Sequence, residues 1–98
     1  MTRADIESIV LAAMRAANAA RTPDQQLVVS PDAPVFGRHS TLDSLGLVAL
    51  LIDVEDALAD RGVHLTLSDE RAMSQSRSPF RDVPSLVSFI EGLLAPAP

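Results

Sequence analysis

Hydrophobic residues recur at helical spacing in three stretches of the chain. In the first stretch, which ends at about Ala20, they are separated by three or four positions, as on one face of an α-helix. They are Ile6, Ile9, Val10, Ala13, Met14 and Ala17. Thr2 followed by Asp5 has the form of a capping box with Asp in place of Glu. The pattern predicts a first helix near the N-terminus.

The second stretch, residues 44–60, carries two apolar stripes. The stripe expected to face a core consists of Leu47, Leu50, Leu51, Val54 and Leu58. A second stripe, roughly on the other side, consists of Leu45, Val48 and Ile52. Two interpretations of this second stripe stay open: it faces a partner, or it packs under a loop. The last turns carry acids that we expect to be solvated, namely Asp53, Glu55, Asp56 and Asp60, and Gly62 is placed to end the helix.

The third stretch begins after Asp82, which we expect to cap a last helix that tolerates Pro84 in its first turn. Its apolar face consists of Val83, Leu86, Val87, Ile90, Leu93 and Leu94. Between the second and third stretches, apolar and polar residues alternate over residues 63–67 as they do in a β-strand. The chain has no second strand-like segment to pair with it, which indicates an extended linker. Residues 68–73 could form one short helical turn.

The segment from Arg21 to Leu42 contains three prolines and Gly37, so a helix is implausible there. Such long loops are uncommon in compact domains unless they are functional or disordered. We expect its apolar residues to pack against the core and so to attach the loop to it. They are Leu27, Val28, Val29, Val35 and Phe36. The pattern predicts an all-α fold, a small four-helix bundle of three main helices and one short one, with a long loop between the first and second helices. Residues 1–95 would form a single domain and residues 96–98 a flexible tail.

Composition and charge narrow the functional classes. A chain of 98 residues that is 47% hydrophobic fits one globular domain, and the absence of cysteine excludes disulfides and thiolate chemistry. The net charge is −5, and it comes from residues 41–70, which carry one Arg against seven acids. An acidic field repels nucleic acid, and a chain without lysine lacks a polybasic membrane patch. We therefore expect protein partners, no nucleic acid and no membrane, and a cytoplasmic location because no leader segment is recognisable.

Residues for a catalytic triad exist, but their context argues against an enzyme. Ser44, Asp43, His39 and His64 could supply the side chains, yet no strand-turn-helix elbow is present and a bundle this small rarely encloses a pocket. The two histidines lie far apart with no helical His/Glu pairing, so we predict no metal site.

The segment Leu42-Asp43-Ser44-Leu45 lies between the long loop and an apolar helix. Here the chain resembles the acyl and peptidyl carrier protein family. In that family the serine of an Asp-Ser-Leu motif, at the start of the second helix, receives 4'-phosphopantetheine from coenzyme A. The resemblance extends over essentially the whole chain, and it implies that Ser44 is the attachment site and that Asp43 and Leu45 are recognition residues. The transferase would supply the chemistry, so the chain itself would not be an enzyme.

Physical chemistry supports an anion at Ser44 independently of the family. The first turn of a helix has free backbone N–H groups and the positive end of the helix dipole, so a phosphodiester on that serine meets a favourable field. The plainer interpretation is that Ser44 only caps its helix, while Asp43 adds charge and Leu45 packs.

The chain departs from fatty-acid carriers, which usually place acids early in the second helix. Here those positions hold Gly46 and Ala49, which implies a hydrophobic partner surface as in peptidyl-type carriers. We expect that surface to consist of Val48, Ala49, Ile52 and Met73. The stretch 69–80 is also longer and more polar than in common fatty-acid carriers, which suggests a specialised, stand-alone carrier.

Two hypotheses follow. The first is a monomeric carrier that holds an acyl or aminoacyl group as a thioester on 4'-phosphopantetheine. Its partners would be a phosphopantetheinyl transferase, a loading ligase and downstream transferases of a specialised biosynthetic pathway. The alternative is a small helical interaction or regulatory module without a prosthetic group, which binds one partner helix through the same apolar stripe.

Overall fold

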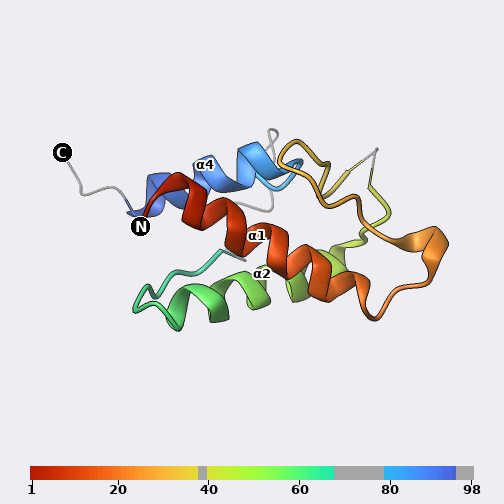
Figure 1. The fold of residues 1–98 in the computed structure, drawn as a ribbon, viewed down its shortest axis with the longest axis horizontal. Helices are drawn as coiled ribbons and strands as arrows, with labels where there is room; N and C mark the ends of the chain where they lie inside the picture. The colour runs from red at the N-terminus through yellow and green to blue at the C-terminus, as the bar shows by residue number, and fades with distance from the viewer. Residues whose placement is uncertain (38–39, 68–78, 95–98) are drawn as a thin grey trace.

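The computed structural model describes residues 1–37, 40–67 and 79–94. In these ranges the chain forms three α-helices, α1 (Arg3–Asn18), α2 (Ser44–Ala59) and α4 (Val83–Leu94), and one 3₁₀ turn, η1 (Pro23–Gln25). Helix α1 lies between the other two and contacts both (Figure 1). The all-α class and the three main helices are confirmed. The short helical turn expected at residues 68–73 lies outside the described residues.

The helix ends follow the local signals of the sequence. The hydroxyl of Thr2 accepts a hydrogen bond from the amide of Asp5 at 3.2 Å, and the Asp5 carboxylate accepts one from the amide of Thr2 at 2.9 Å. This is the predicted capping box. The hydrogen bonds from the Thr2 amide and side chain hold the pKa of the Asp5 carboxyl below its ordinary value. Gly62, with φ of +80°, ends α2 in the left-handed conformation that glycine adopts without strain.

Asp82 caps α4 as predicted, because its carboxylate accepts a hydrogen bond from the amide of Ser85 at 2.8 Å. Partial burial raises the pKa of Asp82. The hydrogen bonds from the side chain and amide of Ser85, together with the charge of Arg81, outweigh that effect and bring the pKa below its ordinary value. The Arg3 side chain also pairs with Glu91 and so joins α1 to α4.

One aliphatic core joins the helices to the loop. The predicted inward stripe of α2 is buried, as are Ile6 to Met14 of the α1 stripe and Val83 to Ile90 of the α4 stripe. Leu94 of the same stripe is half-buried and packs against the core, whereas Leu93 is exposed, so its assignment to the apolar face is wrong. The residues outside the helices that enter the core are Leu27, Ala33, Val35, Leu42, Leu67 and Phe80.

The long loop is packed against the core, although not at every predicted residue. Leu27 and Val35 are buried, but Val28 is 64% exposed, which contradicts its assignment as an anchor. Ala33, which the sequence did not single out, is buried instead. The side chain of Asn18, at the end of α1, binds both backbone groups of Leu27, accepting from the amide at 2.7 Å and donating to the carbonyl at 2.9 Å. These contacts fix the first half of the loop.

The other half of the loop is attached to the start of α4. The amide of Val35 donates to the carbonyl of Arg81 at 2.9 Å, and the amide of Val83 donates to the carbonyl of Ala33 at 3.0 Å. Together they form an isolated antiparallel bridge centred on Pro34 and Asp82. The loop therefore reaches α2 along a path fixed at both α1 and α4.

Candidate functional site

The Asp-Ser-Leu motif lies at the start of α2. Asp43 is the N-cap: its carboxylate accepts a hydrogen bond from the amide of Gly46 at 2.7 Å, and its carbonyl accepts one from the amide of Leu47 at 2.9 Å. Ser44 is the first helical residue and is exposed. The interpretation in which Ser44 caps the helix is therefore wrong, because the adjacent Asp43 occupies that position.

The Ser44 hydroxyl has no partner among the described residues, so it is accessible to another molecule. The backbone amides of Ser44 and Leu45 likewise find no acceptor there, as expected for the first turn of a helix. A phosphodiester on the Ser44 oxygen would lie beside these donors and the positive helix end, so the residues present fit such a group. Asp43 adds a negative charge nearby, but its carboxylate is bound to the Gly46 amide.

Gly46 packs closely against the side chains of Leu42 and Asp43, which lead into α2. Leu42 is buried, and a Cβ atom at Gly46 would lie 2.8 Å from the Leu42 Cδ1 atom and 3.0 Å from the Asp43 Oδ1 atom. A side chain at position 46 would therefore force Leu42 or Asp43 to shift. Leu42 thus anchors the chain in the core directly before the cap, and the next residue after the cap is Ser44.

The second apolar stripe of α2 is largely exposed. Leu45 is 79% exposed and Ile52 is 47% exposed, while Ala49 is exposed and Val48 is half-buried. We call these four residues the exposed stripe. The interpretation in which Val48 or Ile52 packs under the loop therefore fails for Ile52 and stays open for the half-buried Val48. The plainer interpretation, in which Leu45 packs, is wrong. Met73, the other residue expected on this surface, lies outside the described residues.

The acids in the second half of α2 have two different environments. Asp53, Asp56 and Asp60 are exposed, and no ion pair joins their side chains to other described residues. Glu55 was expected to be solvated, but it is half-buried and its carboxylate accepts a hydrogen bond from the amide of Leu67 at 3.2 Å. It therefore holds the extended linker against α2.

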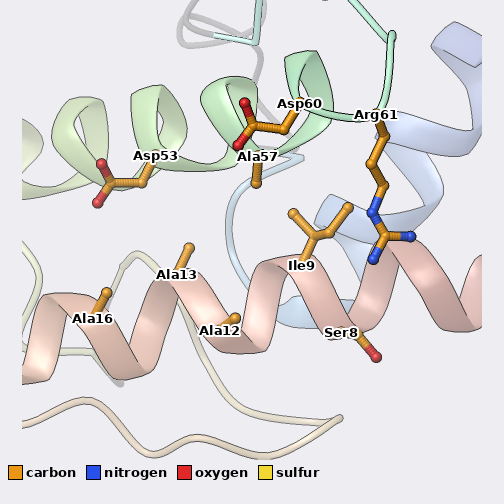
Figure 2. A pocket seen from close by; sticks show the side chains of 9 residues that line it. All are labelled: Ser8, Ile9, Ala12, Ala13, Ala16, Asp53, Ala57, Asp60 and Arg61. Atoms are coloured by element: carbon orange, nitrogen blue, oxygen red, sulfur yellow. The ribbon is translucent and has the colours of Figure 1, made fainter.

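A groove of about 580 Å³ separates the middle of α1 from the end of α2 (Figure 2). Its walls are Ser8, Ile9, Ala12, Ala13 and Ala16 on one side and Asp53, Ala57, Asp60 and Arg61 on the other. The small alanine side chains leave this space open. Of the α2 residues that line the groove, Asp53 is the nearest to Ser44 in the sequence. At a rise of about 1.5 Å per residue, it lies roughly 13 Å farther along the helix axis than Ser44. The groove was not predictable from the sequence, because alanines at helical spacing are typical of ordinary packing.

The histidines do not form a site in the described ranges. His64 is exposed, and His39 lies outside the described residues. Within the described part of the chain, no three His, Cys, Asp or Glu side chains gather in a way that could hold a metal ion. No helix in that part has the length and apolar character needed to cross a membrane.

Comparison with known proteins identifies no similar protein. No protein-family model matches the chain, and no curated protein and no solved structure is significantly similar to it. These comparisons therefore lend no support to the resemblance to carrier proteins that the sequence suggested.

Proposed function

We propose that this protein carries acyl or aminoacyl groups as thioesters on 4'-phosphopantetheine attached to Ser44. The observation that carries the proposal is the exposed and unpartnered Ser44 hydroxyl at the first position of α2, inside an Asp-Ser-Leu motif whose aspartate caps the helix. The carrier-type four-helix bundle, with a short helix near residues 68–73, is part of the proposal. So are a monomeric state and a cytoplasmic location.

The attachment needs a nucleophile from this chain and a base from the transferase. The Ser44 Oγ atom attacks the phosphorus of coenzyme A that bears the pantetheine arm. A new phosphorus–oxygen bond forms, the bond to 3',5'-adenosine diphosphate breaks, and the serine proton passes to the transferase. The free amides of the first turn and the helix dipole stabilise the resulting phosphodiester. When attached, the arm supplies a terminal thiol for the thioester.

The exposed stripe is the proposed contact surface for partner enzymes. It begins at Leu45, next to the attachment site, and continues to Ile52. Exposed apolar side chains gathered on one surface are typical of interaction sites. The proposed partners are a phosphopantetheinyl transferase, a loading ligase and downstream transferases of a specialised pathway, with Asp43 and Leu45 as recognition residues.

Intact mass spectrometry tests the proposal. Incubation with coenzyme A and a broad-specificity phosphopantetheinyl transferase should add one phosphopantetheinyl group to the wild type, and Ser44→Ala should abolish the addition. Because Asp43 provides the cap, Ser44→Ala should change the free energy of unfolding by no more than about 0.5 kcal/mol. Ser8→Ala, which changes an exposed serine of α1, is the control and should be modified like the wild type. An unmodified wild type, or modification at another serine, would contradict the proposal.

The exposed stripe also favours a second candidate, a helical interaction module without a prosthetic group. Such a module would bind an apolar helix of its partner through Leu45 and Ile52. It would gain no mass in the experiment above, and Ser44→Ala would leave partner binding unchanged. The two candidates therefore differ in their dependence on Ser44.

A further inference from the structure

Arg21, which lies just after α1, is bound to both ends of the long loop. Its Nε atom donates to the carbonyl of Gln25 at 2.6 Å. Its Nη2 atom donates to the carbonyl of Thr41 at 3.1 Å and lies 3.2 Å from the Thr41 hydroxyl. That hydroxyl in turn donates to the carbonyl of Gln25 at 2.8 Å. One side chain thus holds together two segments that the loop separates.

The held segment leads directly to Ser44. Thr41 is followed by the buried Leu42 and by the cap Asp43, and Ser44 comes next. The core therefore fixes this segment from the inside, through Leu42, and Arg21 fixes it from the outside.

We infer that Arg21 is a positioning residue for Ser44: it holds Thr41 so that the start of α2 presents the Ser44 hydroxyl in the orientation that phosphopantetheine transfer needs. The inference rests on the proposed function. The role of Arg21 is to position the loop, since its Nε and Nη2 atoms are bound there.

The chemistry of the side chain explains why arginine is needed. A guanidinium has several donors in a rigid plane and can bind Gln25 and Thr41 together, whereas a lysine ammonium is a compact group on a flexible stem. The contacts of Arg21 lie at the surface, where water can replace the hydrogen bonds that are lost. Loss of Arg21 should therefore affect the placement of Ser44 more than it affects folding.

Arg15 provides a matched control. It lies in the last turn of α1, is exposed, and has no hydrogen bond or ion pair with any described residue. Arg15→Ala and Arg21→Ala change the net charge equally, and both lie near the C-terminal end of α1. A difference between the two variants cannot come from charge alone.

The test measures the kinetics of phosphopantetheine transfer from coenzyme A by a broad-specificity transferase, with the full chain well below its melting temperature. In Arg21→Ala we expect kcat to fall about tenfold with KM for the carrier unchanged, because a misplaced nucleophile reacts less often once bound. Arg21→Lys should not restore kcat, and Arg15→Ala should match the wild type. Thr41→Val, which removes the hydroxyl but keeps the carbonyl contact, should have an intermediate kcat.

Hydrogen exchange gives a second measurement that does not use the transferase. The amide of Gly46, bound to Asp43, should exchange faster in Arg21→Ala than in the wild type or in Arg15→Ala. The amide of Ile90 in α4 should keep its wild-type protection in all three proteins. Equal acceleration at both amides would mean general destabilisation and would overturn the positioning role.

The outcomes separate the inference from the proposed function. If the wild type gains no phosphopantetheinyl group, the proposed function is overturned and this inference with it. If the wild type is modified but Arg21→Ala keeps the wild-type kcat, only the role of Arg21 is overturned. If Arg21→Ala does not fold, Arg21→Lys and Thr41→Val decide, and wild-type kcat in both would overturn the inference.

Discussion

Helix α2 has two apolar stripes that are similar in sequence and opposite in environment. The inward stripe, Leu47 to Leu58, is buried against the rest of the core, whereas Leu45 and Ile52 of the exposed stripe face outward. The difference comes from the neighbours of α2, since α1 packs along one side of it only (Figure 1). Hydrophobicity alone therefore does not distinguish a residue that stabilises the fold from one that is available to a partner.

The largest loss of stability is expected from a charge in the inward stripe. Leu51→Asp would bury an unpaired carboxylate at a fully buried position. We expect the free energy of unfolding to fall by several kcal/mol, a large part of the roughly 5–15 kcal/mol that is typical of small domains. The variant should show no cooperative unfolding transition by circular dichroism. A cooperative transition near that of the wild type would contradict the assignment of Leu51 to the core.

The next largest effect is expected at the start of α2. Gly46→Ala should destabilise the protein by about 1–3 kcal/mol, because the new Cβ atom would collide with Leu42 and disturb Asp43. Alanine is otherwise the better helix former by about 1 kcal/mol. Gly92→Ala in α4 is the matched control, since nothing lies within 4 Å of its added Cβ atom. Urea unfolding should show a lower free energy of unfolding for Gly46→Ala and a higher one for Gly92→Ala. An equal increase in both variants would contradict the close approach at Gly46.

A charge in the exposed stripe should have a smaller effect on stability. Ile52→Asp, next to Leu51 in the sequence, should keep the helical content and change the free energy of unfolding by no more than about 1 kcal/mol. If the stripe contacts partner enzymes, the same variant should be loaded or modified more slowly. Circular dichroism and the transfer rate measure the two effects. Unfolding as severe as that of Leu51→Asp would show that the stripes are assigned wrongly.

A change of pH affects the carboxylates that cap the helices and leaves both apolar stripes unchanged, because the stripes do not titrate. The pKa of Asp82 is lower in the folded protein than its ordinary value of 3.8. The unfolded chain therefore binds the proton more tightly, and the contribution of Asp82 to stability is present above about pH 4 and is lost as the pH falls through the folded pKa. Asp5 acts in the same direction. Urea unfolding at pH 6 and pH 3 should show the loss.

Asp82→Asn is the control for this acid effect, because asparagine still caps a helix but does not titrate. The fall in stability between pH 6 and pH 3 should be smaller in this variant than in the wild type. An equal fall would place the acid sensitivity at other carboxyl groups.

The helices were predictable because their signals are local. The capping box of Thr2 and Asp5, the cap Asp82 and the terminating Gly62 each act within a few residues. The place of Ser44 at the start of α2 was also predictable from the motif and the apolar period that follows it. The choice of cap was not, because aspartate and serine are both good N-caps and here they are adjacent.

That choice depends on where the loop delivers the chain, which in turn depends on contacts between distant residues. Neither the burial of Leu42 nor the hydrogen bond from Arg21 to Thr41 is marked by a repeating pattern in the sequence. Nor is the burial of Ala33 in place of Val28, because an irregular segment has no repeating face. The part of the site that sequence reasoning missed is thus the part that tertiary contacts build.

The backbone bridge between the loop and the start of α4 has a consequence for the order of folding. Its two hydrogen bonds join Ala33 to Val83 and Val35 to Arg81, residues separated by about half the length of the chain. Closing so long a segment is entropically costly, so such contacts form late, after local helices have begun to pack. The part of the loop around Ala33 and Val35 can then take its final course only once α4 has docked. Each transient release of α4 should free this part of the loop as well, so the amides of Val35 and Val83 should share one opening event.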